Sequence, residues 1–322
     1  MASGSLNQAK KNKNDEFYTR LEDISDELYY YRHHFQGKSV FLNCDDPTAS
    51  NFWRYFELNF DDLGLTRLVS THYHPTERTY KLVMERDENG DITTTKTPLE
   101  GNGDFRSAEC VALLDEADII TTNPPFSLFR EYVALLIEHQ KQFVIMGNKN
   151  AITYKEFFPL LMNNQIWVGA TSLNGGRLMI MPKGIEIQSK HAKTLSDGTV
   201  ILGVAGVCWF TNMDIDKRHA PLTLWKDYDP QEYPHYDNYD AIEVSKVNEI
   251  PCDYYGVMGV PITFMDKYCP EQFHIIGFDL DVAGPITING KVKERPGRMY
   301  VNGKRLYSRI LIQRVDQPDA TD

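Results

Sequence analysis

The chain has 322 residues and a mass of 37.1 kDa, which is enough for one large domain or two moderate ones. Its net charge of −11 argues against a protein that coats nucleic acid through an overall positive charge. It has no apolar run of about 18 residues and no signal-peptide core, so we expect a protein of the cytoplasm without a membrane span.

Strands and helices are expected to alternate from residue 39 to residue 169. Apolar runs typical of buried strands cover 39–43, 68–71, 117–122, 142–147 and 166–169. Helical periodicity covers 21–34, 51–60, 109–114, 127–139 and 154–162, and the segments 80–84 and 92–97 flank a turn with hairpin composition. This alternation predicts an α/β fold with a doubly wound, mostly parallel sheet and helices on both of its faces.

The same pattern predicts the limits of the domains. Residues 1–14 are small and polar and should form a flexible tail, whereas 15–212 should contain the sheet, with a last strand at 207–211. Residues 171–199 are punctuated by glycine and carry several lysines, which indicates a loop insertion. Residues 213–322 are dense in tyrosine, proline and aspartate, and we expect a second region there.

A short stretch stands where the strand at 117–122 ends and a helix begins, and it consists of Asn123, Pro124, Pro125 and Phe126. Ligands of open α/β sheets bind at this edge. A plain turn that ends a strand, with Ser127 as the N-cap of the next helix, is one interpretation. The residue types allow a second interpretation, which is chemical.

The exocyclic amine of an aromatic base is a poor nucleophile, because its lone pair is delocalised into the ring. The side-chain oxygen of Asn123 and the backbone carbonyl of Pro124 could each accept one of the two N–H bonds, which would return the lone pair to the nitrogen. The two prolines would stiffen the turn and hold both acceptors in place. Phe126 could stack on the base. The stretch therefore predicts a catalytic loop for an amine or amide nitrogen.

Two other loops could hold a small ligand at the same edge. The loop after the first strand lacks glycine and carries two acids in the run Asn43, Cys44, Asp45 and Asp46. These acids would repel a phosphate and would suit a cation such as S-adenosylmethionine, although a surface acid pair has the same pattern. Farther along, Asp104 could accept a hydrogen bond from an adenine amino group and Phe105 could line its ring, unless Asp104 only stabilises a helix N-terminus.

No metal site is expected. The five cysteines form no C-x-x-C pair, and Cys110 and Cys208 lie in apolar runs typical of a core. His72 and His74 could share one face of a strand, but no further ligands stand near them in the sequence.

Several stretches of the sequence resemble those of a known protein family. The stretches that carry this resemblance lie at 15–19, 43–47, 103–107, 123–126, 236–242 and 256–264, and the resemblance as a whole covers nearly everything from about 10 to 314. In this combination the sequence resembles the EcoRI-type adenine-specific DNA methyltransferases. The resemblance implies transfer of a methyl group from S-adenosylmethionine to N6 of an adenine that is flipped out of double-stranded DNA.

The resemblance also implies roles for individual residues. It assigns the methionine part of the cofactor to Phe17, Tyr18 and Thr19, and the cofactor loop to Asn43, Cys44, Asp45 and Asp46. It assigns the cofactor adenine to Asp104 and Phe105, and catalysis to Asn123, Pro124, Pro125 and Phe126. The chain departs from the wider methyltransferase class in two places: the cofactor loop lacks glycine, and His72, Tyr73 and His74 stand where an acid for the ribose is expected.

Contacts to DNA phosphates are expected from basic residues outside the sheet. The segment 291–314 has eight basic residues and one acidic residue, a net charge of +7, although a solvated charged surface would look the same. The expected DNA-binding residues are Lys190, Lys193, Arg295, Arg298, Lys304 and Arg305. The loops at 171–199 and the region 213–314 would lie near DNA and read its sequence.

Two other functions fit parts of the same pattern. An amino-methyltransferase of RNA bases or of a protein glutamine faces the same delocalised nitrogen. A DNA-binding relic without activity is a non-enzyme alternative, against which the intact Asn123, Pro124 and Asp104 argue. For the DNA enzyme we expect protective modification in a bacterial or phage-infected cell, and a restriction endonuclease that acts on the same site without binding this chain.

Overall fold

The computed structural model of the protein describes residues 18–44, 46–181, 192–288, 290–294 and 297–315. The predicted tail at 1–14 and four predicted site residues lie outside this set, namely Phe17, Asp45, Lys190 and Arg295. The chain divides into two compact units: unit 1 comprises Met1–Lys149 and Val168–Asp214, and unit 2 comprises Asn150–Trp167 and Ile215–Asp322.

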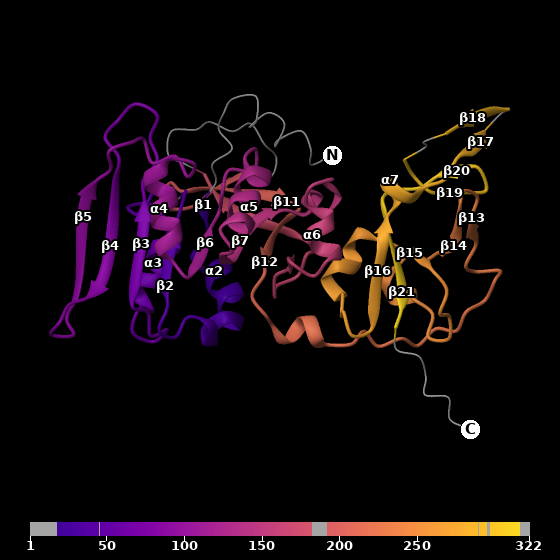
Figure 1. Ribbon diagram of the computed structural model, residues 1–322, viewed down its shortest axis with the longest axis horizontal. Helices are drawn as coiled ribbons and strands as arrows, with labels where there is room; N and C mark the ends of the chain where they lie inside the picture. The colour runs from indigo at the N-terminus through magenta and orange to yellow at the C-terminus, as the bar shows by residue number, and fades with distance from the viewer. Residues whose placement is uncertain (1–17, 45, 182–191, 289, 295–296, 316–322) are drawn as a thin grey trace, which may run out of the picture. The chain divides into compact units, whose positions relative to one another are not determined.

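A large mixed sheet lies at the centre of unit 1 (Figure 1). Its strands are β2 (Ser39–Leu42), β3 (Arg67–Thr71), β4 (Tyr80–Arg86), β5 (Ile92–Pro98), β6 (Ile119–Thr122), β7 (Gln142–Asn148), β8 (Trp167–Val168) and β12 (Val207–Thr211). They follow the order β5-β4-β3-β2-β6-β7-β12-β8. The inner strands β3, β2, β6 and β7 pair in parallel, whereas β4, β5 and β12 add antiparallel pairs. The predicted α/β class, the hairpin and the last strand are thus confirmed.

The inner strands are buried along almost their whole length, which is typical of strands covered on both faces. Phe41 in β2, Ile120 in β6 and Ile145 in β7 are fully buried. The helices α3 (Asn51–Leu58), α4 (Ala108–Glu116) and α5 (Phe129–Glu138) pack against β3, β2 and β7, respectively. Ser50 and Ser107 cap α3 and α4, because each side chain accepts a hydrogen bond from a backbone N–H in the first turn.

The N-terminal helix α2 (Leu21–Leu28) continues as the 3-10 helix η1 (Tyr29–His34). Its residue Glu27 is fully buried and accepts hydrogen bonds from the Tyr31 hydroxyl at 2.8 Å and the Ala170 amide at 2.6 Å. The other carboxylate oxygen accepts from the amide of Thr171 at 2.8 Å. This carboxylate therefore anchors the segment that follows β8. Each described helix falls short of the length or the apolar character that a bilayer span needs.

Three details of the sequence-based prediction were wrong. The stretch at 171–199 is not a loop throughout, because it contributes to a four-stranded sheet of β1 (Tyr18–Thr19), β9 (Gly176–Ile180), β11 (Val200–Ala205) and β10 (Ala192–Thr194). These strands are short and partly exposed, so their apolar pattern is weak. Ser127 does not cap α5, which begins at Phe129 with Leu128 at its N-cap. The helix expected at 154–162 shrinks to α6 (Phe158–Met162), preceded by η2 (Lys149–Thr153).

Unit 2 is built on a five-stranded sheet with the order β13-β14-β15-β21-β16. The strands are β13 (His235–Tyr236), β14 (Tyr239–Glu243), β15 (Met258–Pro261), β16 (Phe273–Phe278) and β21 (Arg309–Arg314). The core of this unit contains Ile242, Val260 and Leu311, all of which are fully buried. The ring of Phe158 in α6 lies 5.0 Å from that of Phe278, so this helix packs on β16 although it precedes β8 in the sequence.

Two hairpins and several short helices complete unit 2 (Figure 1). The hairpins are β17 (Ile286–Ile288) with β18 (Lys291–Lys293) and β19 (Tyr300–Val301) with β20 (Lys304–Arg305). The helices are η3 (Asp216–His219), η4 (Val247–Glu249), η5 (Ile262–Lys267) and α7 (Asp279–Val282). The hairpins and α7 lie toward the same end of the sheet, at the top of the orange and yellow part of Figure 1.

Candidate active site

Three strand ends of unit 1 meet at Asn43. Asn43 and Asn123 directly follow the neighbouring parallel strands β2 and β6. Thr122, the last residue of β6, donates its hydroxyl hydrogen to the backbone carbonyl of Asn43. Thr71, the last residue of β3, donates its hydroxyl to the Asn43 side-chain oxygen at 3.3 Å. The expected cofactor loop and the expected catalytic loop therefore leave the same edge of the sheet side by side.

The expected catalytic loop is rigid, and part of it is accessible to solvent. Pro124 is buried, whereas Asn123, Pro125 and Phe126 are half-buried. The amide of Leu128 donates to the Pro125 carbonyl at 2.9 Å, which closes the turn before α5. No described residue donates a hydrogen bond to the Pro124 carbonyl. The turn thus uses the carbonyl of Pro125 internally and leaves that of Pro124 without a donor among the described residues.

The cofactor loop replaces the missing glycine with a local hydrogen bond. Cys44 adopts a φ of 71°, in the left-handed region that favours glycine. The side-chain oxygen of Asn43 accepts from the Cys44 amide at 2.9 Å and holds this conformation. The side-chain nitrogen of Asn43 is buried and has no hydrogen-bond partner among the described residues. A buried donor without a partner costs about 1–3 kcal/mol, so this amide is available for a further hydrogen bond in the loop.

Asp46 lies in the same loop, and hydrogen bonds hold its carboxylate in place. Its Oδ1 accepts from the Thr48 amide at 3.0 Å, from the Thr48 hydroxyl at 2.8 Å and from the Tyr80 hydroxyl at 2.9 Å. Its Oδ2 lies 3.9 Å from Nε2 of His72. Burial alone would raise the pKa of Asp46, but the hydrogen bonds from Thr48 and Tyr80 outweigh it and hold the pKa below its ordinary value. A carboxylate that stays ionised suits a cationic ligand.

Asp104 forms a two-point ion pair with its neighbour Arg106. Nε of Arg106 donates to Oδ1 at 2.9 Å and Nη2 donates to Oδ2 at 2.7 Å. These bonds lower the pKa of Asp104 against the opposing effect of burial. Phe105 is only 4% exposed and packs edge-to-face on Tyr132 at 5.1 Å. Phe105 therefore packs in the core beside the site, and Asp104 is the polar group that this loop offers.

The loop before α4 is pressed against the loop after β3. A Cβ atom on Gly103 would overlap the carbonyl oxygen of His72, and its φ of 76° also favours glycine. The amide of His74 donates to the Asn102 carbonyl at 3.1 Å. His72, which occupies the place of the expected ribose acid, stacks on the Tyr80 ring at 5.0 Å. This close approach brings Asp104 to the strand ends that carry Asn43 and Asp46.

The N-terminal segment is tied to the same loops. Tyr18 and Thr19 form β1, which pairs with β9 opposite Ile180 and Met179. The carbonyl of Thr19 accepts a hydrogen bond from Nδ2 of Asn51 at 2.7 Å, and Asn51 begins α3 directly after the cofactor loop. The sequence analysis missed the three bridging residues Thr71, Thr122 and Asn51. A polar residue at the carboxyl end of a predicted buried strand is the signal that could have found the two threonines.

The basic residues predicted to contact DNA differ in their availability. Lys193 on β10 and Lys304 and Arg305 on β20 are exposed. Arg298 is half-buried and donates to the Gly297 carbonyl at 2.8 Å and to Asp279 at 3.5 Å. The net charge of 291–314 therefore overstates the free positive charge of this segment.

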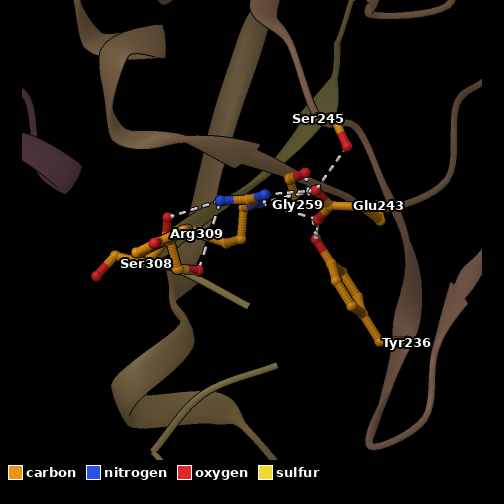
Figure 2. A network of polar contacts seen from close by, with 7 residues as sticks. Tyr236, Glu243, Ser245, Gly259, Ser308 and Arg309 are labelled. Carbon is orange, nitrogen blue, oxygen red and sulfur yellow. Dashed lines mark hydrogen bonds and ion pairs between the residues drawn. The ribbon is translucent and has the colours of Figure 1, made fainter. Parts of the chain in front are cut away.

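Two more arginines of the same segment are engaged inside unit 2. Arg314 donates to the Cys252 carbonyl and lies over the Tyr255 ring at 4.7 Å. Arg309 is 9% exposed and forms an ion pair with Glu243, which is 6% exposed. Figure 2 shows that the Tyr236 hydroxyl also donates to this carboxylate. A sequence-based count of charges treats all these arginines as exposed, which is why it could not separate them.

Known proteins resemble the chain along nearly its whole length. The family described as "Adenine-specific methyltransferase EcoRI" matches residues 5–315. The Type II methyltransferase M.EcoRI of Escherichia coli is 44% identical over 319 residues, which are 94% of this chain and 97% of that protein. The Type II methyltransferase M.MpnI of Mycoplasma pneumoniae is 40% identical over 319 residues, which are 96% of this chain and 97% of that protein. No solved structure matches the chain. The chain therefore belongs to the EcoRI family of adenine-specific methyltransferases.

Proposed function

We propose that the protein transfers a methyl group from S-adenosylmethionine to N6 of an adenine flipped out of a specific site in duplex DNA. The hydrogen bond from Thr122 to the Asn43 carbonyl carries this proposal, because it ties the loop for the base to the loop for the cofactor. Family membership supports the adenine substrate and the need for a methyl donor. The loop chemistry supports S-adenosylmethionine as that donor.

The chain's own groups would hold the cofactor as follows. The ionised Asp46 attracts a positive charge, and the unpaired Nδ2 of Asn43 donates to a ligand oxygen or nitrogen. Asp104 can accept from the adenine amino group with lone pairs that Arg106 leaves open. Tyr18 and Thr19, with Phe17 before them, would border the methionine part. S-adenosylmethionine, when bound, supplies an electrophilic methyl group on a sulfonium sulfur.

The catalytic loop would prepare the nitrogen. Oδ1 of Asn123 and the carbonyl of Pro124 accept the two N–H bonds of the target amine, which concentrates the lone pair on N6. Pro125 fixes the turn, and Phe126 stacks on the flipped base. With both acceptors in place, N6 would attack the methyl carbon that the cofactor supplies, the carbon–sulfur bond would break with its electrons going to sulfur, and N6 would release one proton to water.

Unit 2 would bind and read the DNA. Its exposed Lys304 and Arg305 can contact phosphates, and Lys193 offers a further contact from unit 1. We also propose that the sheet of unit 1 is doubly wound, which is supported by its inner parallel strands and by the helices that connect them. The expected biological role is protection of host DNA against a restriction endonuclease that acts on the same site without binding this chain.

Two experiments test this function. Sequencing DNA from a host that expresses the protein should find N6-methyladenine at one short site, and DNA from a host that expresses Asn123→Ala should lack it. The purified protein with tritium-labelled cofactor should label duplex DNA, and not RNA or protein. Label found only in RNA or only in protein would identify that molecule, and not DNA, as the substrate. If none of the three is labelled, an inactive DNA-binding protein becomes the favoured alternative.

A further inference from the structure

Tyr307 projects from unit 2 without any role in its core. It is 90% exposed, more than any other large apolar or aromatic side chain among the described residues. It lies between β20 and β21, two residues after the exposed Arg305. A tyrosine buries a large ring at little entropic cost when it meets a partner, so an isolated exposed ring beside free positive charge is typical of a contact surface.

The backbone that carries Tyr307 is fixed from inside the unit (Figure 2). Nη1 of Arg309 donates to the carbonyls of Tyr307 and Ser308 at 3.5 and 3.3 Å. The same guanidinium donates to Glu243 through Nε at 2.9 Å, and Glu243 accepts in turn from the Tyr236 hydroxyl. A buried ion pair adds little net stability over an apolar pair of the same volume, and fixing one conformation is its better-attested use.

The hairpin on the other side of Tyr307 is fixed as well. The carboxylate of Asp237 accepts from the amides of Asn302 and Gly303 at 3.1 and 2.7 Å, which holds the turn between β19 and β20. The side chain of Asn238 accepts from the Tyr300 amide at 3.0 Å. Residues 237 and 238, which belong to the stretch 236–242 named in the sequence analysis, thus position the hairpin that precedes Tyr307.

The surroundings of Tyr307 carry positive charge. Lys304 and Arg305, on the hairpin strand directly before it, are exposed, and neither forms an ion pair with a described residue. Lysine and arginine beside an exposed aromatic ring are the combination that binds a nucleic acid, because phosphates meet the cations and a base meets the ring.

We propose that Tyr307 contacts the bases of the target DNA by stacking or by insertion between two base pairs, with the buried Glu243–Arg309 pair as its positioning element. This inference rests on the proposed function and assigns one residue of its DNA contact. Side chains that insert between bases unstack the duplex and help to deform it, a step that any enzyme that flips a base requires.

A binding experiment separates stacking from charge. The probe is a fluorescein-labelled duplex that carries the site found methylated in host DNA, measured by anisotropy over a range of salt concentrations. Tyr307→Ala should weaken binding about 5- to 100-fold, whereas Tyr307→Phe should bind like the wild type. The salt slope should stay unchanged in Tyr307→Ala, because no charge is lost, and should fall by about one unit for each charge removed in Lys304→Ala and Arg305→Ala.

A cross-linking experiment gives a direct readout. A duplex with 5-iododeoxyuridine near the site, irradiated in complex with the full-length protein, should yield a peptide cross-linked at Tyr307. Tyr29→Ala, which removes a tyrosine that is 69% exposed in unit 1, is the matched control and should change neither binding nor the cross-link. Melting curves should be the same for all of these variants.

The outcomes distinguish the two proposals. If the wild type methylates DNA but Tyr307→Ala binds the duplex as tightly as the wild type, and the wild type yields no cross-link at Tyr307, then Tyr307 has no part in DNA contact and this inference fails alone. If the wild type does not methylate DNA, the proposed function fails first. A weaker Tyr307→Phe would also contradict stacking, because the hydroxyl would then carry the contact.

Discussion

Arg106 holds both carboxylate oxygens of Asp104, at 2.9 and 2.7 Å, in the loop that faces the strand ends of unit 1. Arg106 also reaches Glu131 in α5 at 3.0 Å and lies over the Phe105 ring at 5.1 Å. The ion pair fixes the direction in which the remaining lone pairs of Asp104 point. A residue that would contact the cofactor is thus oriented by a neighbour that need not touch the cofactor itself.

This relationship predicts the behaviour of Asp104→Asn. The variant should bind S-adenosylmethionine about 10- to 100-fold more weakly, because a hydrogen bond to a charged group contributes about 1.5–3 kcal/mol. Calorimetry with the demethylated cofactor product gives a readout that does not depend on turnover. Glu131→Gln, which removes the other partner of Arg106, should bind almost normally. Equal losses in both variants would mean that the loop, and not Asp104, holds the ligand.

The same pair predicts a pH dependence. Since Arg106 lowers the pKa of Asp104, the carboxylate stays charged down to a pH below its ordinary value, and its contribution disappears only as the pH falls through the lowered pKa. In Arg106→Met the pKa should return toward its ordinary value, so cofactor affinity should begin to fall at a higher pH than in the wild type. Calorimetry between about pH 4 and about pH 7 should show this shift. Identical profiles would contradict it.

Asn123→Ala should lose methyl transfer and keep the cofactor. Removing a preorganised acceptor at a reacting centre lowers the rate about 100- to 1000-fold. The cofactor affinity should remain close to that of the wild type, because Asn123 is assigned to the target amine. Single-turnover methylation beside calorimetry and a melting curve checks all three properties. A folded Asn123→Ala variant that methylates at the wild-type rate would end the proposed mechanism.

Glu243→Gln should destabilise unit 2. The substitution leaves the buried Arg309 without its counter-charge, and breaking a buried pair in this way lowers the free energy of unfolding by about 3–5 kcal/mol. Glu249→Gln, which breaks the more exposed pair with Lys246, should cost less than about 1 kcal/mol. Urea unfolding measures both values. Similar costs would show that the Glu243–Arg309 pair is solvated in the native state.

Asp279→Asn should change how stability depends on pH. Asp279 is fully buried, and burial raises its pKa to about 6 despite the nearby Arg298 and Arg309. The folded protein therefore binds more protons here than the unfolded chain, so this group lowers stability as the pH rises from about 4 to about 6. Asp279→Asn should be more stable than the wild type at pH 7.5 by up to about 3 kcal/mol. The difference should vanish near pH 4, as urea unfolding at several pH values would reveal.

Much of unit 1 was predictable because its signals are local. The apolar run that ends at Thr122 and the prolines that follow it define a strand and a rigid turn without reference to the rest of the chain. The loops at Asn43 and Asp104 were recognisable for the same reason, since each follows or precedes an element with a clear period.

The remaining features depend on residues that are far apart in the sequence. Arg309 and Glu243 are separated by 66 positions, so no local pattern shows that this arginine is buried and not exposed. Gly176 to Ile180 form a strand because Ile201 to Ala205 pair with them, and their own composition resembles a loop. The hydroxyl of Thr122 can bond to the carbonyl of Asn43 only because β2 and β6 lie next to each other, and the sequence alone does not show that the two strands are neighbours.

With the proposed role of unit 2 in reading DNA, the placement of Asn150–Trp167 within this unit affects how the enzyme could acquire a new recognition site. Phe158 packs on Phe278, so the core of unit 2 is completed by a segment encoded between β7 and β8. An exchange of the C-terminal half alone between two relatives would join a foreign sheet to this helix. A functional hybrid must exchange both segments together, which favours gradual change of surface residues over recombination as the route to new specificity.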